Sequence, residues 1–83
     1  MYIRFRLPQY GDYHRTLEFI KHQVQAWAEQ YGVRYTQKTI KYEHRVAFDH
    51  DETYTLWSMT WAPPAKLQQI LTYELVNVAG ERY

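Results

Sequence analysis

The sequence predicts a small α+β domain in which a strand, a helix, two strands and a second helix follow one another along the chain. Apolar and polar residues alternate over residues 2–7 and again over 40–61, which is typical of half-buried strands. Between these segments, apolar residues recur at three- and four-residue steps over residues 13–31, as they do on the buried face of a helix. With a length of 83 residues, these patterns predict a single domain spanning residues 1–83.

The first strand is expected over residues 2–7 and ends before Pro8, which has no N–H group for a sheet hydrogen bond. One face of this strand is apolar and consists of Ile3, Phe5 and Leu7. The other face carries Tyr2, Arg4 and Arg6. Because successive side chains of a strand point to opposite faces, we expect the tyrosine and the two arginines to lie away from the core.

The first helix is expected over residues 13–31. Asp12 is a suitable N-cap residue, and Gly32 stands where a left-handed residue commonly ends a helix. Phe19 lies off the apolar stripe, so it either widens the buried face or is exposed. The stripe itself consists of Tyr13, Leu17, Ile20, Val24, Trp27, Ala28 and Tyr31.

Residues 40–61 are predicted to form a β-hairpin whose turn is residues 49–52. The second strand is expected to begin at Val33, but Val33 and Tyr35 have the opposite parity to Ile40, so a bulge or break is expected within residues 36–39. The alternation gives the hairpin one mixed, basic face and one apolar face. The apolar face consists of Ile40, Tyr42, His44, Val46, Phe48, Thr53, Thr55, Trp57, Met59 and Trp61.

A second helix is expected over about residues 64–79, because Pro63 and Pro64 end the sheet and favour the first turn of a helix. Its apolar positions follow helical spacing as far as Gly80. The alternative is a fourth strand over residues 73–79, which the β-branched Val76 and Val78 favour, but it leaves no turn residues between helix and strand.

These elements assemble into a β-α-β-β-α order in which the third strand lies between the other two, parallel to the first and antiparallel to the second. Both helices would cover the apolar face of the three-stranded sheet. This arrangement is the ferredoxin-like sandwich without its last strand. The opposite face would be open, with Glu43 as its one carboxylate. Its expected binding residues are Tyr2, Arg4, Arg6, Lys41, Arg45, Tyr54 and Leu56.

Composition excludes several classes of protein. Ten basic and nine acidic side chains give a net charge of +1, which argues against a general affinity for polyanions. The chain has no cysteine, and therefore neither a disulfide framework nor a thiolate metal site. No apolar run approaches the roughly 20 residues that span a bilayer, and the N-terminus has no apolar block of a signal peptide. We therefore expect a cytoplasmic protein with no membrane partner.

The basic and aromatic face predicts a small non-enzymatic binding protein, of the adaptor or inhibitor type, whose partner is another protein or a second copy of itself. Single-stranded RNA or DNA is the alternative partner, because arginines follow phosphates while bases stack on aromatic rings. In architecture this resembles RNA-recognition-motif domains, but the paired aromatics and glycine of their two signature strands are absent. A third interpretation is that alternating Arg and Tyr residues only solubilise an ordinary sheet face.

An enzymatic function is the weakest hypothesis. The segment YEHRVAFDHDETYTL, residues 42–56, resembles the strand hairpin of RelE/YoeB-type messenger-RNA endonuclease toxins. That resemblance implies a small RNase-type enzyme in which Arg45 supports phosphodiester cleavage. The chain lacks the second N-terminal helix of that family and its C-terminal strand with a catalytic His or Tyr. We therefore expect no catalytic residues and no cofactor.

Two groups of histidine and carboxylate side chains could in principle ligate a metal ion. His14, Glu18 and His22 lie along one ridge of the first predicted helix, but the two histidines are two turns apart. The predicted turn 49–52 has three carboxylates and an imidazole, which are also ordinary turn residues. We interpret both as solvated surface and predict no metal. His44 is expected to be a buried, hydrogen-bonded histidine beside Trp57.

Overall fold

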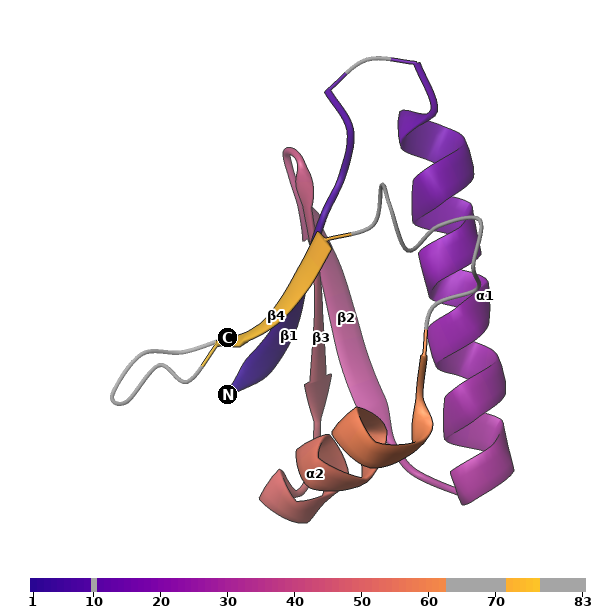
Figure 1. The fold of residues 1–83 in the computed structure, drawn as a ribbon, viewed down its shortest axis with the longest axis vertical. Coiled ribbons are helices and arrows are strands. Elements are labelled where there is room, and N and C mark those ends of the chain that lie inside the picture. Colours follow the sequence, from indigo (N-terminus) through magenta and orange to yellow (C-terminus); the bar gives the residue numbers. More distant parts are fainter. Residues whose placement is uncertain (10, 63–71, 77–83) are drawn as a thin grey trace.

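The computed structural model describes residues 1–9, 11–62 and 72–76. It shows a small α+β domain with two helices and a four-stranded antiparallel sheet (Figure 1). Its elements are β1 (Tyr2–Arg6), α1 (Tyr13–Tyr31), β2 (Tyr35–Ile40), β3 (Glu43–Phe48), α2 (Asp51–Thr60) and β4 (Thr72–Val76). The prediction of an α+β domain is confirmed, whereas the predicted number of three strands is wrong.

The strands lie in the order β2-β3-β1-β4, so β1 and β3 are central and β2 and β4 form the edges. Each neighbouring pair is antiparallel, with Arg4 opposite Arg45 in the central pair and opposite Glu74 in the β1–β4 pair. The strand between β1 and β2 is β3, residues 43–48, which were predicted to belong to the second strand rather than the third. It is antiparallel to both neighbours, so the predicted central strand over residues 53–61 and its parallel pairing with the first strand are wrong.

The hairpin of this fold turns at Lys41 and Tyr42, where β2 passes into β3. The predicted hairpin over residues 40–61, with its turn at 49–52, is therefore wrong. The chain reverses before β3, which also explains the change of parity: Tyr35 of β2 lies directly opposite Phe48 of β3, so both side chains are on the same face. The expected bulge or break within residues 36–39 is wrong, because β2 continues without interruption from Tyr35 to Ile40 and the turn follows at Lys41 and Tyr42.

The segment predicted as the last strand of that hairpin is the helix α2. Asp51 and Glu52 occupy its first turn, where negative charge interacts favourably with the helix dipole. Tyr54 and Trp57 are buried three residues apart on one side of the helix. The helix ends at Thr60, and the N–H of the C-cap residue Trp61 donates to the Trp57 carbonyl over 2.9 Å.

The fourth strand pairs with the outer side of β1. The predicted second helix over residues 64–79 is wrong for residues 72–76, which form β4, and the alternative of a strand over 73–79 is confirmed for residues 73–76. The remainder of both predictions, together with the Pro63–Pro64 helix start, lies outside the described residues.

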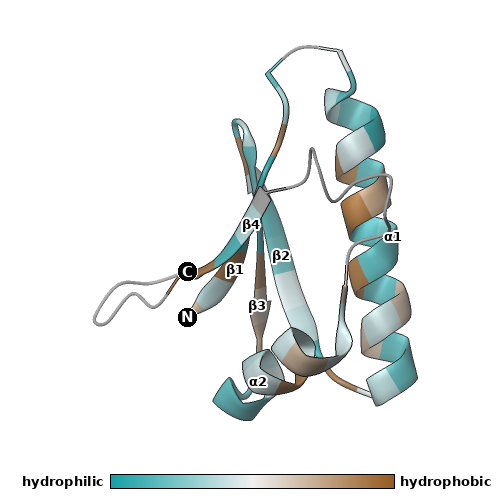
Figure 2. Ribbon diagram, viewed as in Figure 1, coloured by the Kyte–Doolittle hydropathy of each residue, from teal (hydrophilic) through white to brown (hydrophobic). Residues whose placement is uncertain are grey.

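The helix α1 confirms the prediction residue for residue. Gly32 ends it with φ of 64°, in the left-handed region that a residue without a Cβ adopts without strain. Asp12 is at the N-cap, but its side chain makes no capping hydrogen bond; its backbone carbonyl accepts the Thr16 N–H. Phe19 is half-buried, so it widens the buried face. In Figure 2 hydrophobic and hydrophilic bands alternate along this helix.

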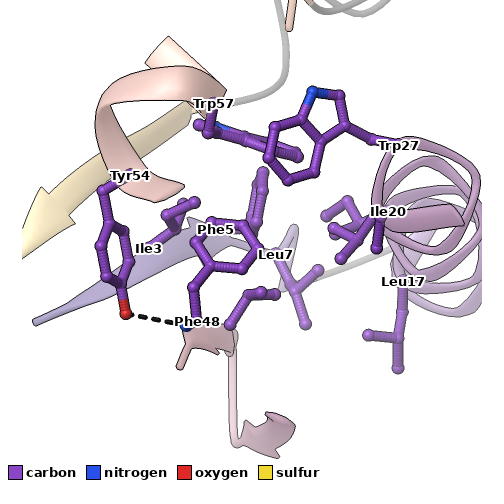
Figure 3. Packing of buried hydrophobic residues seen from close by; sticks show 12 residues of the cluster. Ile3, Phe5, Leu7, Leu17, Ile20, Trp27, Phe48, Tyr54 and Trp57 are labelled. Atoms are coloured by element: carbon purple, nitrogen blue, oxygen red, sulfur yellow. Dashed lines mark hydrogen bonds between the residues drawn. The ribbon is translucent and has the colours of Figure 1, made fainter. Parts of the chain in front are cut away.

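The core lies between one face of the sheet and the two helices. Phe48 of the sheet contacts rings from both helices, and Phe5 contacts Trp57 of α2 (Figure 3). Trp57 packs edge-on against Trp27 and stacks on Trp61 at 4.5 Å between centroids. The buried apolar cluster consists of Ile3, Phe5, Leu7, Leu17, Ile20, Val24, Trp27, Ala28, Val46, Phe48, Tyr54 and Trp57. Among the described residues, no helix is long and apolar enough to span a bilayer.

Candidate binding face of the sheet

One face of the sheet is covered by neither α1 nor α2, since both helices pack on the face that carries Phe5 and Phe48. The period-two alternation of each strand, with the observed register, decides which side chains lie on this uncovered surface. We call it the open face. It consists of Tyr2, Arg4, Arg6, Thr36, Lys38, Ile40, Glu43, Arg45, Ala47, Glu74 and Val76.

Charges of alternating sign form a chain across the open face. Arg6 lies 3.6 Å from Glu74, whose carboxylate also accepts a hydrogen bond from Arg4 Nε at 2.9 Å. Arg4 lies 3.6 Å from Glu43 on its other side, and Glu43 lies 3.2 Å from Arg45. Each carboxylate is therefore shared by two arginines, and the chain of ion pairs connects β4, β1 and β3.

The register explains why both carboxylates are needed. Arg45 is directly opposite Arg4 on one side and Lys38 on the other, and like charges in such positions repel. Glu43 relieves the repulsion between Arg4 and Arg45 because it pairs with both, and Glu74 does the same for Arg4 and Arg6. The hydrogen bond from Arg4 lowers the pKa of the Glu74 carboxyl, so this carboxylate stays ionised below its ordinary range.

The aromatic ring of the open face is covered by a cation. The Arg45 guanidinium carbon lies 4.8 Å from the centroid of the Tyr2 ring, in a cation–π contact. Tyr2 is buried, with only 7% of its surface exposed. A planar ligand could reach this ring only if Arg45 moved away.

The structure brings together four of the predicted binding residues and separates three. Tyr2, Arg4, Arg6 and Arg45 share the open face, whereas Lys41 lies in the β2–β3 turn at its end. The predicted placement of Tyr54 and Leu56 on the open sheet face is wrong, because both belong to α2. The expectation that Glu43 is the one carboxylate is also wrong, because Glu74 lies on the same face.

Tyr54 is buried because it links α2 to the sheet. Its hydroxyl accepts the Phe48 N–H over 2.9 Å and donates to the Met1 carbonyl over 2.7 Å, which ties α2 to the end of β3 and to the N-terminus. Burial raises the pKa of this hydroxyl. Leu56 is half-buried and packs against the core.

Five residues of the open face were not predicted from the sequence: Thr36, Lys38, Ile40, Glu74 and Val76. Lys38 and Ile40 reach this face because β2 ends at the two-residue turn, and a hairpin closed at residues 41–42 would have placed them correctly. Placing Glu74 on this face would have required the prediction of the fourth strand. The sequence feature that could have indicated that strand is a carboxylate able to pair with Arg4 across it.

The β2–β3 turn is fixed by contacts from outside the hairpin. Tyr13 donates its hydroxyl proton to the Lys41 carbonyl over 2.8 Å, and the Leu7 N–H donates to the Tyr42 carbonyl over 2.7 Å. The Tyr13 and Tyr42 rings also meet edge to face at 6.2 Å. These contacts hold Lys41 at φ of 51°, an uncommon conformation for a residue other than glycine.

His44 is fully buried on the opposite, helix-covered face, which confirms the prediction of a buried, hydrogen-bonded histidine. Its Nδ1 lies 2.9 Å from the Thr39 hydroxyl and its Nε2 lies 3.1 Å from Gln37 Oε1. Its cross-strand neighbours are Thr39 and Phe5, so the predicted pairing with Trp57 in a hairpin is wrong. Burial, with a smaller effect of Lys21, lowers its pKa to about 4.

Within the described part of the chain, no three His, Cys, Asp or Glu side chains approach closely enough to hold a metal ion. His14, Glu18 and His22 are all exposed on α1, and Glu18 lies 3.9 Å from Lys21. No protein-family model, curated protein or solved structure matches the chain, so the function has to be argued from this geometry.

Proposed function

We propose that this protein is a non-enzymatic binding protein whose open face docks an acidic segment of a protein partner. The observation that supports this best is the Arg6–Glu74–Arg4–Glu43–Arg45 chain of charges on a surface that neither helix covers. With Lys38, the described part of this face has four basic and two acidic side chains. Each guanidinium has five N–H donors, so an arginine already paired with one carboxylate has donors left for a second.

Arg6 is the residue best placed to meet an incoming carboxylate. Its side chain is 64% exposed, against 24% for Arg4, and its nearest carboxylate, Glu74, also serves Arg4. A partner carboxylate that binds Arg6 therefore competes with a shared ion pair at the surface. Such exposed pairs contribute little, so the exchange costs little free energy.

An acidic partner is favoured over a second copy docked face to face. In a face-to-face dimer whose two-fold axis passes the centre of this face, the central cations Arg4 and Arg45 would lie close to the same pair of the copy. Adjacent cations would then repel across the interface. A negatively charged segment removes that repulsion and gives electrostatic complementarity.

A protein segment is also favoured over single-stranded nucleic acid. Binding of single strands depends on bases that stack on exposed rings, with roughly 1–3 kcal/mol for each base. The ring that the first strand presents, Tyr2, is buried beneath Arg45. The face therefore offers guanidinium groups rather than a stacking platform.

We also propose that the fold is a ferredoxin-like sandwich. The strand order β2-β3-β1-β4, the uniformly antiparallel pairing and the passage of α1 between β1 and β2 support this assignment. In that arrangement the outer face of the sheet is a common place for ligands, because no helix occupies it.

The proposal is tested by fluorescence anisotropy with a short labelled glutamate-only peptide and a labelled oligothymidine, from low to physiological ionic strength. We expect salt-dependent binding of the peptide that is weakened several-fold by Arg6→Ala. Arg15→Ala is the matched control, since Arg15 is an exposed arginine on α1 paired with Asp12 at 3.9 Å. Equal effects of the two variants, or preferential binding of oligothymidine, would contradict the proposed protein partner.

A further inference from the structure

We propose that the docking surface continues from the open face onto the β2–β3 turn, and that the acidic segment of the partner carries an apolar side chain that binds against Ile40 and Tyr42. This inference rests on the proposed function and specifies the chemistry of the partner. Charge alone would make the open face an unselective surface for acidic chains. The turn supplies an apolar site next to the charges.

Ile40 and Tyr42 are both large and exposed, at 39% and 47% of their surface. Together with Lys41, Glu43 and Arg45 they line a shallow hollow of about 290 Å³. Arg45 and Glu43 also belong to the charge chain. The hollow therefore joins two apolar walls to a guanidinium and a carboxylate, which is the composition of a site that takes an apolar side chain beside an acidic one.

The turn is rigid enough to act as a preformed site. The Tyr13 hydroxyl holds the Lys41 carbonyl, the Leu7 N–H holds the Tyr42 carbonyl, and the Tyr13 ring supports the Tyr42 ring. These contacts come from β1 and α1 flanks, outside the hairpin. A surface that is already ordered loses less conformational entropy when it binds, so exposed apolar groups on it contribute more to affinity.

The register fixes the spacing that the partner needs. Ile40 is directly opposite Glu43, and Glu43 is directly opposite Arg6, so Ile40 and Arg6 lie two strands apart in one row. Two strand spacings are roughly 9.5 Å, and a partner segment in the polyproline II conformation rises about 3.1 Å per residue with three residues per turn, which places every third side chain on the same side. A carboxylate on Arg6 and an apolar side chain at Ile40 therefore belong to positions about three residues apart in the partner.

The test compares three short peptides of equal length by titration into 15N-labelled protein: glutamate only, glutamate with one central leucine, which has a glutamate three residues away on either side, and lysine with a leucine at the same place. We expect the glutamate–leucine peptide to bind about tenfold more tightly than the glutamate-only peptide, and to shift the amide signals of Ile40 and Tyr42. The lysine–leucine peptide should not bind, because it repels the arginines.

Variants at the turn assign the gain to the proposed site. Tyr42→Ala and, independently, Ile40→Ser should reduce the advantage of the leucine-containing peptide to less than about threefold. Tyr31→Ala is the matched control, because Tyr31 is a similarly exposed tyrosine at the far end of α1 and should preserve the tenfold difference.

The possible outcomes distinguish the apolar site at the turn from the acidic docking function on which it rests. If the two acidic peptides bind equally well through Arg6, the apolar site is refuted while the acidic docking face stands. If neither acidic peptide binds, both the proposed function and this inference are refuted. A glutamate–leucine gain that persists in both turn variants would also overturn the inference, because the leucine would then bind elsewhere.

Discussion

Acidification should destabilise this protein through His44, well above the pH at which carboxylates titrate. The imidazole is fully buried, and burial lowers its pKa from 6.5 to about 4 in the folded state. An unfolded chain exposes the ring and restores the ordinary value. As the pH falls below 6.5, His44 becomes protonated in the unfolded state while it stays neutral in the folded state, so the free energy of unfolding decreases.

The size of the effect follows from the shift. One pKa unit corresponds to about 1.4 kcal/mol, so the full loss between pH 6.5 and 4 is about 3 kcal/mol, of which about 2 kcal/mol is already lost at pH 5. Above pH 6.5 this residue should contribute no pH dependence, and below pH 4 its contribution should be constant. A small domain has a total stability on the order of 5–15 kcal/mol, so the loss is readily measurable.

The geometry around the ring supports a neutral imidazole. Gln37 Oε1 accepts from Nε2–H, and Nδ1 accepts from the Thr39 hydroxyl, so both nitrogens of one neutral tautomer are satisfied. Phe5 is the cross-strand neighbour on β1, and the charged group acting on the ring is Lys21 of α1, which further disfavours a second cation. Burial and the charge of Lys21 both disfavour an added proton on this ring.

The assay is urea unfolding followed by tryptophan fluorescence between pH 7.5 and 5, in wild type, His44→Gln and His22→Gln. His44→Gln should be less stable than wild type near neutral pH but should lose much less stability on acidification. His22→Gln replaces an exposed histidine and should follow wild type. A wild-type stability that is flat over this range, or the same slope in His44→Gln, would refute the reasoning. Glu74 does not confuse the measurement, because its lowered pKa places its own contribution at more acidic pH.

Three further variants test the packing and the turn. Trp57→Ala should cost about 3–5 kcal/mol in urea unfolding, because the indole is the centre of the aromatic cluster, whereas Met59→Ala on the exposed side of α2 should change little. Tyr54→Phe should cost about 1–3 kcal/mol, because it leaves the buried Phe48 N–H without an acceptor; an unchanged midpoint would show that water replaces the hydroxyl. Lys41→Gly should leave thermal stability equal or raise it by up to about 1 kcal/mol, since relief of the left-handed strain opposes the greater entropy of unfolded glycine, and a clear loss would contradict strain at this turn.

The elements that the sequence predicted correctly are those whose signals are local. Residues 2–7 alternate without interruption, and α1 has both a continuous apolar stripe and Gly32 at its end. These signals do not depend on where the rest of the chain lies. The same alternation placed Arg4 and Arg6 on the open face, and the parity within β3 placed Arg45 beside them.

The errors arise where two patterns fit the same residues. Over residues 51–61, Thr53, Thr55 and Trp57 alternate like a strand, while Tyr54, Trp57 and Trp61 also have helical spacing. The threonines favour a strand by propensity, and only packing against the core decides for a helix. The β2–β3 turn could not be predicted from the sequence for a related reason. Lysine and tyrosine are not residue types typical of turns, and contacts from Tyr13 and Leu7 impose the conformation of Lys41 and Tyr42.

The corrected position of α2 also changes what the open face offers a ligand. Because Tyr54 and Leu56 pack into the core, the open face has neither the ring nor the aliphatic side chain that the sequence predicted at its centre. Glu74 lies next to Arg4 on this face, which therefore carries a row of shared ion pairs. Exposed apolar area is then found at the end of the face, on Ile40 and Tyr42. The chemistry that fits this surface is therefore a carboxylate at the centre with an apolar group at the turn, rather than stacked bases across the middle of the sheet.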